Sequence, residues 1–157
     1  MPKLDQIDMK ILKLLQDDGR MTNVDLAEKV GISAPPCLRR VRALEDAGLI
    51  KGYHADLSDK ALGFEVRVFA MVGLHSQAEA DLQAFEELCR SWDYVRECHM
   101  LNGEIDFLLK CVAPDLSSFQ KFLTENLTSA ENVANVKTSL VIRCGKDTPG
   151  VPIVIES

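Results

Sequence analysis

The chain has 157 residues, of which 46% are hydrophobic and 27% charged, and its formal net charge at pH 7 is −6. These values are typical of a soluble globular protein with one domain or two small ones. No stretch approaches the run of about 18 apolar residues that a membrane-spanning helix needs. Residues 1–10 lack the apolar core of a signal peptide. We therefore expect a cytoplasmic protein without a membrane partner.

The negative charge is confined to one part of the chain. Residues 1–60 contain ten basic and ten acidic residues, whereas residues 61–157 contain eight and fourteen. Between Cys37 and His54, four basic residues stand against two acidic ones. Affinity for a polyanion depends on the charge of the contacting face, so this segment can bind DNA although the chain is acidic. Because the surplus is small, we expect several copies to act together.

Apolar residues at helical spacing predict a first helix before Gly19, at Leu4, Ile7, Ile11, Leu14 and Leu15. Asp5 and Asp8 suit the positive end of this helix. We expect it to pack across the next two helices and to support them.

Residues 22–54 contain two predicted helices, a three-residue turn between them and a basic segment with glycine. Thr22 and Ser33 are the expected N-caps of the two helices, and Gly31 and Gly48 are expected to end them. This order describes a winged helix-turn-helix, in which the second helix enters the major groove of DNA.

The second of these helices has an inward apolar line and an outward basic one. Its spacing places Leu38, Val41 and Leu44 inward and leaves the arginines outside. A merely solvated basic face is the alternative, but two capped helices, a turn and a basic ribbon together favour DNA binding. We expect the DNA contacts to come from Ser33, Arg39, Arg40, Arg42, Lys51 and His54.

The second half alternates strands with helices. Strands are predicted at 65–75, 94–101, 105–112 and 137–144, and helices from a Ser76–Glu79 capping box and from Asp115. The helix positions expected inward are Leu82, Phe85, Leu88, Cys89 and Trp92, and Leu116, Phe119, Phe122, Leu123 and Leu127. The order βαββαβ is that of the ferredoxin-like split unit, which makes the predicted fold class α+β.

These elements predict four parts of the chain. They are a winged helix-turn-helix domain (1–54), a linker (55–64), a ferredoxin-like domain (65–147) and a C-terminal tail (148–157). The tail has two prolines around a β-prone run, so it is either a loose end or an extra edge strand.

The predicted strands are apolar on both faces. In residues 65–75, Phe69 and Met71 point one way, and the opposite face carries Val66, Val68, Ala70, Val72 and Leu74. Two helices cover only one face of a four-stranded sheet. We therefore expect two sheets to pack face to face in a homodimer.

Signals for a metal or a catalytic site are weak. The five cysteines are odd in number and lie in apolar contexts, which indicates buried thiols rather than disulfides. Cys98, His99 and His75 lack a second pair at metal-ligand spacing, and adjacent strand residues point to opposite faces. The sequence has no Gly-rich phosphate loop and no nucleophile elbow. We expect no metal, no cofactor and no enzymatic activity.

The pattern S-x-x-x-C-x-x-R-V-x-x-L-E-x-x-G is met by Ser33, Cys37, Arg40, Val41, Leu44, Glu45 and Gly48. With the βαββαβ module and the segment ECHMLNGEIDFLLK, this chain resembles the Lrp/AsnC family of transcription regulators over essentially its whole length. The resemblance implies sequence-specific DNA binding, an amino-acid-sensing, ACT-like second domain, and dimers that join into octamers or similar discs.

The family's effector loop carries G-x-x-D, which Gly103 and Asp106 match. Glycine allows close backbone approach to a carboxylate, and an aspartate suits an ammonium group. A plain hairpin turn with a solvated aspartate is the alternative. The resemblance implies an effector pocket, completed across an interface between dimers, of Met100, Leu101, Asn102, Gly103, Glu104, Asp106, Ser139 and Leu140.

Two other functions stay open at this point. The chain could be an amino-acid-binding regulatory subunit whose helix-turn-helix docks on a protein partner. It could also be an architectural DNA-binding protein without an effector. Salt-dependent DNA binding distinguishes a transcription regulator from a subunit that docks on a protein. Calorimetry with amino acids distinguishes it from an architectural protein without an effector.

Overall fold

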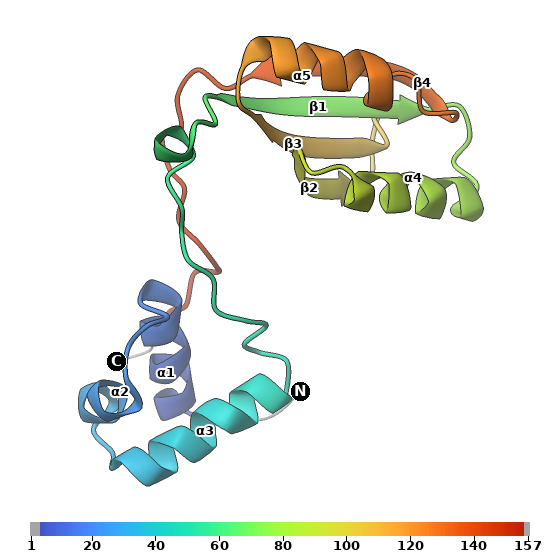
Figure 1. Cartoon of the computed structure of the whole chain (residues 1–157). Coiled ribbons are helices and arrows are strands. Elements are labelled where there is room, and N and C mark those ends of the chain that lie inside the picture. Colours follow the sequence, from blue (N-terminus) through green and yellow to red (C-terminus); the bar gives the residue numbers. More distant parts are fainter. Residues whose placement is uncertain (1–3, 156–157) are drawn as a thin grey trace. The chain divides into compact units, whose positions relative to one another are not determined.

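The computed structural model describes residues 4–155, which form two compact units (Figure 1). One unit runs up to Asp56 and also includes the residues from Lys146 onward, and the other is Leu57–Gly145. Each unit has its own apolar core. Residues 1–3 and 156–157, which fall within the predicted DNA-binding domain and tail, lie outside the described residues.

The first unit contains three helices, α1 (Gln6–Asp17), α2 (Asn23–Val30) and α3 (Ala34–Asp46). Their shared core consists of Ile11, Leu26, Ala27, Val30, Cys37 and Leu44. Gly31, at φ 77°, ends α2 and opens the three-residue turn before α3. The predicted helix-turn-helix is thus confirmed.

One inward position was predicted wrongly. Leu38 is 38% exposed and is not one of the buried core residues. The buried line of α3 runs through Cys37 and Leu44, and Leu38 lies about 100° farther around the helix than Cys37.

The caps of α2 and α3 differ. Thr22 caps α2 as predicted, because its Oγ1 accepts a hydrogen bond from the Asp25 N–H at 3.1 Å. Ser33 stands at the N-cap of α3 but makes no side-chain capping bond. A capping oxygen accepts from the second or third helical N–H, and here these positions are Pro35 and Pro36, which have none. The Ser33 hydroxyl therefore stays available.

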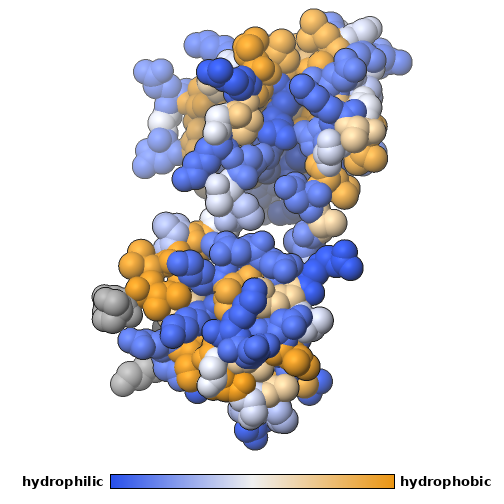
Figure 2. All heavy atoms as spheres, turned by 90° about the vertical axis from the view of Figure 1, so that its left-hand side faces the viewer, coloured by the Kyte–Doolittle hydropathy of each residue, from blue (hydrophilic) through white to orange (hydrophobic). Residues whose placement is uncertain are grey.

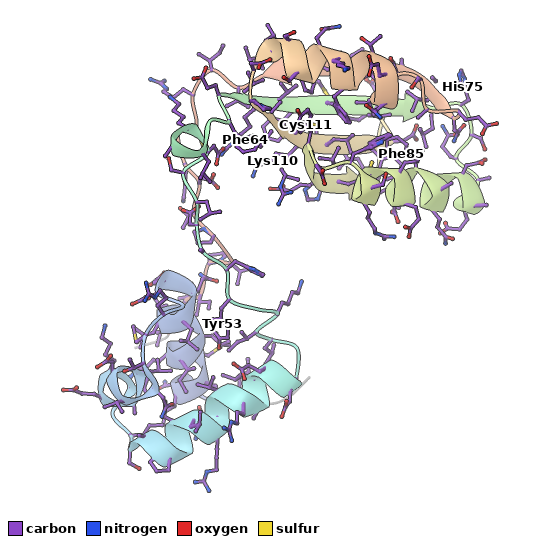
Figure 3. The ribbon with its side chains drawn as sticks, viewed as in Figure 1. Tyr53, Phe64, His75, Phe85, Lys110 and Cys111 are labelled. Atoms are coloured by element: carbon purple, nitrogen blue, oxygen red, sulfur yellow. The ribbon has the colours of Figure 1, made fainter. Side chains whose placement is uncertain are left out.

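The segment after α3 lacks the strands of a paired wing. Gly48, at φ 70°, ends the α3 region, and residues 51–58 have no regular secondary structure. Tyr53 holds this segment to α3, because its hydroxyl donates to Glu45 Oε1 at 2.8 Å (Figure 3). The expected basic ribbon is therefore an irregular segment without β-strands.

The second unit has the elements β1 (Val66–Leu74), α4 (Glu79–Ser91), β2 (Val95–Met100), β3 (Phe107–Ala113), α5 (Leu116–Phe122), a π-helical turn (Leu123–Leu127) and β4 (Val133–Leu140). The four strands form one antiparallel sheet in the order β2-β3-β1-β4. The predicted α+β fold with a βαββαβ domain is confirmed.

The core of this unit lies between the sheet and its two helices. Phe85 of α4 packs against Phe107 of β3, with ring centroids 4.8 Å apart, and Cys111 lies in the same layer (Figure 3). Two positions predicted to be inward are instead exposed, Leu88 at 40% and Leu116 at 58%.

The start of α4 and the bounds of β4 also differ from the prediction. α4 begins after Ala78, so Ser76 and Glu79 form no capping box. The Ser76 hydroxyl donates instead to Asp81 Oδ2 at 2.5 Å. β4 starts and ends four residues earlier than predicted, because it pairs with β1 only as far as Leu140, opposite Val68.

The predicted linker contains a short 3₁₀ helix, Lys60–Leu62. Beside it, Asp59 Oδ2 lies 2.6 Å from Arg67 Nη2 of β1, and this ion pair lowers the pKa of Asp59. The end of the predicted linker therefore belongs structurally to the second unit.

The tail packs on the first unit. The Gln16 side chain of α1 donates to the Val151 carbonyl oxygen at 2.8 Å and accepts from the Val151 N–H at 2.9 Å. Residues 146–155 form no strand. Apolar side chains, including Val151 and Val154, reach the surface, as they do in patches on both units (Figure 2). Within residues 4–155, no helix is long and apolar enough to cross a bilayer.

Candidate DNA-binding and effector-binding sites

The outward face of α3 carries two free cations. Arg39 and Arg42 are both exposed, and neither forms an ion pair within residues 4–155. Residues three apart on a helix lie side by side, so the two guanidinium groups share one face. Ser33, with its uncapped hydroxyl, lies at the start of the same helix and is exposed.

Lys51 and His54 lie in the segment after α3, and both are exposed. The hydrogen bond between Tyr53 and Glu45 ties this segment to α3. Partial desolvation of Tyr53, which is 45% exposed, and its hydrogen bond to the Glu45 carboxylate raise the pKa of Tyr53 to about 12. The phenol therefore stays protonated and keeps donating at neutral pH.

Arg40 differs from its two neighbours and corrects the expectation that all three arginines are left outside. Its Nη1 lies 2.7 Å from Asp8 Oδ1 and 2.8 Å from Asp5 Oδ2, at the start of α1. These carboxylates raise the pKa of Arg40. The Asp8 N–H and the Arg40 guanidinium together hold the pKa of Asp5 below its ordinary value. Arg40 thus binds α3 to α1.

The hairpin between β2 and β3 is exposed at its tip. Met100, Leu101, Asn102, Gly103 and Glu104 all lie on the surface. Gly103 has no atom near the position of a Cβ and no positive φ, so its backbone is open to an approaching ligand.

Asp106 is half-buried and already has a partner. Its Oδ2 accepts a hydrogen bond from the Leu74 N–H at 2.6 Å, and its own N–H donates to the Val72 carbonyl at 3.0 Å. This aspartate is therefore neither a solvated turn residue nor wholly free for a ligand. It ties the end of β1 to the start of β3.

The structure does not bring the two parts of the predicted effector pocket together within one chain. Asp106 contacts the C-terminal end of β1, whereas Ser139 and Leu140 pair with Phe69 and Val68 nearer the other end. At about 3.3 Å per strand residue, these parts are roughly 15–20 Å apart. A small ligand can touch both parts only if they come from different copies of the chain.

Two family models match this chain. "Winged helix-turn-helix DNA-binding" matches residues 4–51, and "Lrp/AsnC ligand binding domain" matches residues 67–151. The chain belongs to the Lrp/AsnC family. It is therefore a DNA-binding transcriptional regulator with an amino-acid-binding domain, and not an enzyme.

Individual Lrp/AsnC proteins are similar to this chain over nearly its whole length. The leucine-responsive regulatory protein of Rhizobium meliloti is 60% identical over 151 residues, covering 96% of this chain and 97% of that protein. The protein of the same name from Escherichia coli K12 is 40% identical, covering 88% and 85%. A Neisseria meningitidis transcriptional regulator, solved as an L-Met complex, matches with a TM-score of 0.91 at 37% identity, covering 96% and 97%.

The Lrp/AsnC sequence pattern is largely structural in this chain. Cys37 and Leu44 lie in the core, and burial raises the pKa of the Cys37 thiol. Arg40 forms the ion pairs with α1, and Gly48 supplies the positive φ after α3. The exposed arginines that differ from these in role, Arg39 and Arg42, lie at the variable positions of the pattern.

Proposed function

We propose that this regulator contacts DNA through the outward face of α3 and its flanks. Arg39 and Arg42 contact base edges or phosphates of the DNA. Ser33 and Lys51 contact phosphates, and His54 makes a further contact with the DNA backbone. The observation that carries this proposal is the contrast among the three arginines. Arg40 is held by two carboxylates, whereas Arg39 and Arg42 lack such partners within residues 4–155. Arg40 acts as a positioning residue.

Binding-site selection from a random duplex pool tests this proposal. The selected duplex and a scrambled one are titrated with protein at rising salt concentration. A sequence-specific reader binds the selected duplex about 10³-fold or more tightly, and its affinity falls steeply with salt. Equal binding of both duplexes would indicate an architectural protein. Absence of salt-dependent binding would indicate a subunit that docks on another protein.

We further propose that the protein is a homodimer formed through the open face of its sheet. That face carries Phe69, Met71, Leu108 and Val112, all at least partly exposed. Beside them, Lys110 Nζ lies 2.7 Å from Glu97 Oε1. Lys110 lies opposite Phe69, and Glu97 neutralises its charge, so this face offers apolar area without an unpaired charge at its centre. Dimers would then join into octamers or similar discs in the cytoplasm, where the DNA lies.

The proposed effector is an amino acid held between dimers. The hairpin of one copy, from Met100 to Asp106, would meet the end of β4 of another copy, at Ser139 and Leu140. The separation of these segments within one chain supports such a shared pocket. The L-Met complex of the Neisseria meningitidis regulator supports an amino acid as the ligand.

Calorimetry with each of the twenty amino acids tests the effector, using Asp106→Asn as the variant. Asparagine keeps an oxygen for the Leu74 N–H but removes the charge that would bind an ammonium group. We expect heat from at least one amino acid with the wild type and a loss of affinity of about tenfold or more in the variant. No heat from any amino acid would refute the proposed sensor.

A further inference from the structure

Leu38 is an apolar side chain of α3 that lies outside the buried core of its unit. It is 38% exposed, whereas Ile11 and Leu44 are buried in that core. α3 has two prolines in its first turn and packs against α1 and α2 through Cys37 and Val41. The position of Leu38 around the helix axis therefore keeps it off the buried line through Cys37 and Leu44.

Leu38 shares its face with the arginines proposed to contact DNA. Pro35, Leu38, Arg39 and Arg42 have the i, i+3, i+4, i+7 spacing of one helix face, and all four are exposed. An isolated exposed leucine is ordinary on a protein surface. Leu38 lies beside Arg42 at the edge of this face, which is the face proposed to enter the groove.

We propose that Leu38 is a specificity-determining residue that contacts the C5-methyl group of a thymine. This inference rests on the proposed DNA contact by α3. Base edges in the major groove present hydrogen-bond donors and acceptors, and the thymine methyl is the apolar group among them. A leucine against any other edge removes water from polar atoms and returns no hydrogen bond. Thymine is therefore the base that Leu38 favours.

The position of this thymine follows from the helix. Leu38 lies four residues before Arg42, so the Cβ atoms of the two residues are about 5–6 Å apart. Base pairs stack about 3.4 Å apart. The thymine should lie within about two base pairs of a guanine, the base whose O6 and N7 accept from an arginine.

The test compares thymine with uracil, which lacks only the methyl group. A duplex is selected from a random pool with the full-length protein, and each thymine is then replaced singly by deoxyuridine. Loss of one buried methyl contact should weaken binding about fourfold at one thymine of each half-site. Leu38→Ala should bind the parent and uracil duplexes equally. Leu49→Ala is the matched control, because Leu49 is 41% exposed and lies outside α3. It should keep the wild-type preference.

Two results would overturn the inference. One is wild-type protein that binds every uracil duplex as tightly as the parent, and the other is Leu38→Ala protein that keeps the preference for thymine. Leu38→Gln keeps a similar side-chain length but has a polar end, so it serves if the alanine variant fails to fold and should also lose the preference for thymine. A different result would show that α3 does not contact DNA at all: Arg42→Ala would then bind the parent duplex as tightly as the wild type.

Discussion

Three arginines within four residues have different environments in this protein. Arg39 and Arg42 face outward on α3, while Arg40 reaches Asp5 and Asp8 at the start of α1. A long side chain with five donors can serve a structural ion pair as readily as a phosphate. Which role each arginine takes is decided by what its helix face meets.

Removal of the Arg40 side chain should therefore lower stability. Arg40→Ala leaves two neighbouring carboxylates without their cation, so we expect the Tm of the protein to fall by roughly 2–5 °C. Arg42→Ala should leave the Tm unchanged, because Arg42 forms no ion pair within residues 4–155. Thermal unfolding followed by circular dichroism measures both variants. An unchanged Tm in Arg40→Ala would show that these ion pairs contribute nothing.

Sequence reasoning could not distinguish these arginines. Helical spacing correctly placed Val41 and Leu44 of α3 inward, but it placed Leu38 there too, and Leu38 is exposed. The ion pairs join residues about 30 positions apart, and their formation depends on how α1 crosses α3. The hydrogen bond of the half-buried Asp106 could not be predicted from the sequence either, because its partner Leu74 lies on another strand.

The start of α1 is an element held together by charge. Asp5 and Asp8 form a reciprocal capping box, with Asp8 N 2.9 Å from Asp5 Oδ1 and Asp5 N 3.1 Å from Asp8 Oδ2. Arg40 adds an ion pair to both carboxylates. The folded state therefore favours the ionised form of Asp5.

Acid should weaken this end of α1. The pKa of Asp5 is lowered from its ordinary value of 3.8, so its contribution to stability is complete above that pH and is lost as pH falls through the lower folded value. Asp5→Asn keeps an acceptor for the Asp8 N–H but does not titrate. Between pH 5 and pH 2.5, the Tm of the wild type should fall more than that of Asp5→Asn. If the Tm of both proteins fell equally with pH, the lowered pKa of Asp5 would not contribute to stability.

The tail is an element whose contact depends on one glycine. Gly150 has φ 77°, and a Cβ at this position would lie 2.0 Å from Gln16 Oε1. Gly150→Ala must therefore displace the Gln16 side chain and break both of its hydrogen bonds with Val151. We expect faster hydrogen exchange at the Val151 amide in this variant. Gly145→Ala is the control, because Gly145 has open space and no positive φ. Equal protection in both variants would show that the tail is held by other contacts.

The sequence predicted the order of elements well and their ends less well. Runs of apolar and β-branched residues identified β1 and β3, which lie in the middle of the sheet and bury most of one face. β4 was shifted by four residues because its apolar run continues past Leu140, where the regular pairing with β1 ends after one further hydrogen bond, from the Val141 N–H to the Arg67 carbonyl. Pairing is a property of two strands, and a single strand's composition does not define where it stops.

At the scale of the whole molecule, we propose that a second copy covers the open face of the sheet. Phe69→Asp would place a charge at the centre of this face and should yield a monomer in sedimentation at micromolar concentration. Leu116→Asp changes an even more exposed residue on α5, on the helix-covered side, and should leave the dimer intact. A dimeric Phe69→Asp protein would show that another surface makes the dimer.

Oligomer formation also bears on DNA affinity. The α3 region has only a small excess of positive charge, so one head supplies few phosphate contacts. Two heads in a dimer would reach successive major grooves about 34 Å apart and bind together. An effector shared between dimers can change how many heads are engaged, which couples amino-acid concentration to gene control.

The central claim is that the outward face of α3 holds DNA, and the affinity of the Arg42→Ala variant for the selected duplex tests it most directly. Loss of a bidentate guanidinium contact should cost about 1–3 kcal/mol of binding free energy. Lys121→Ala removes an exposed cation from α5 and should bind like the wild type. Wild-type affinity in Arg42→Ala and also in Arg39→Ala would contradict the account.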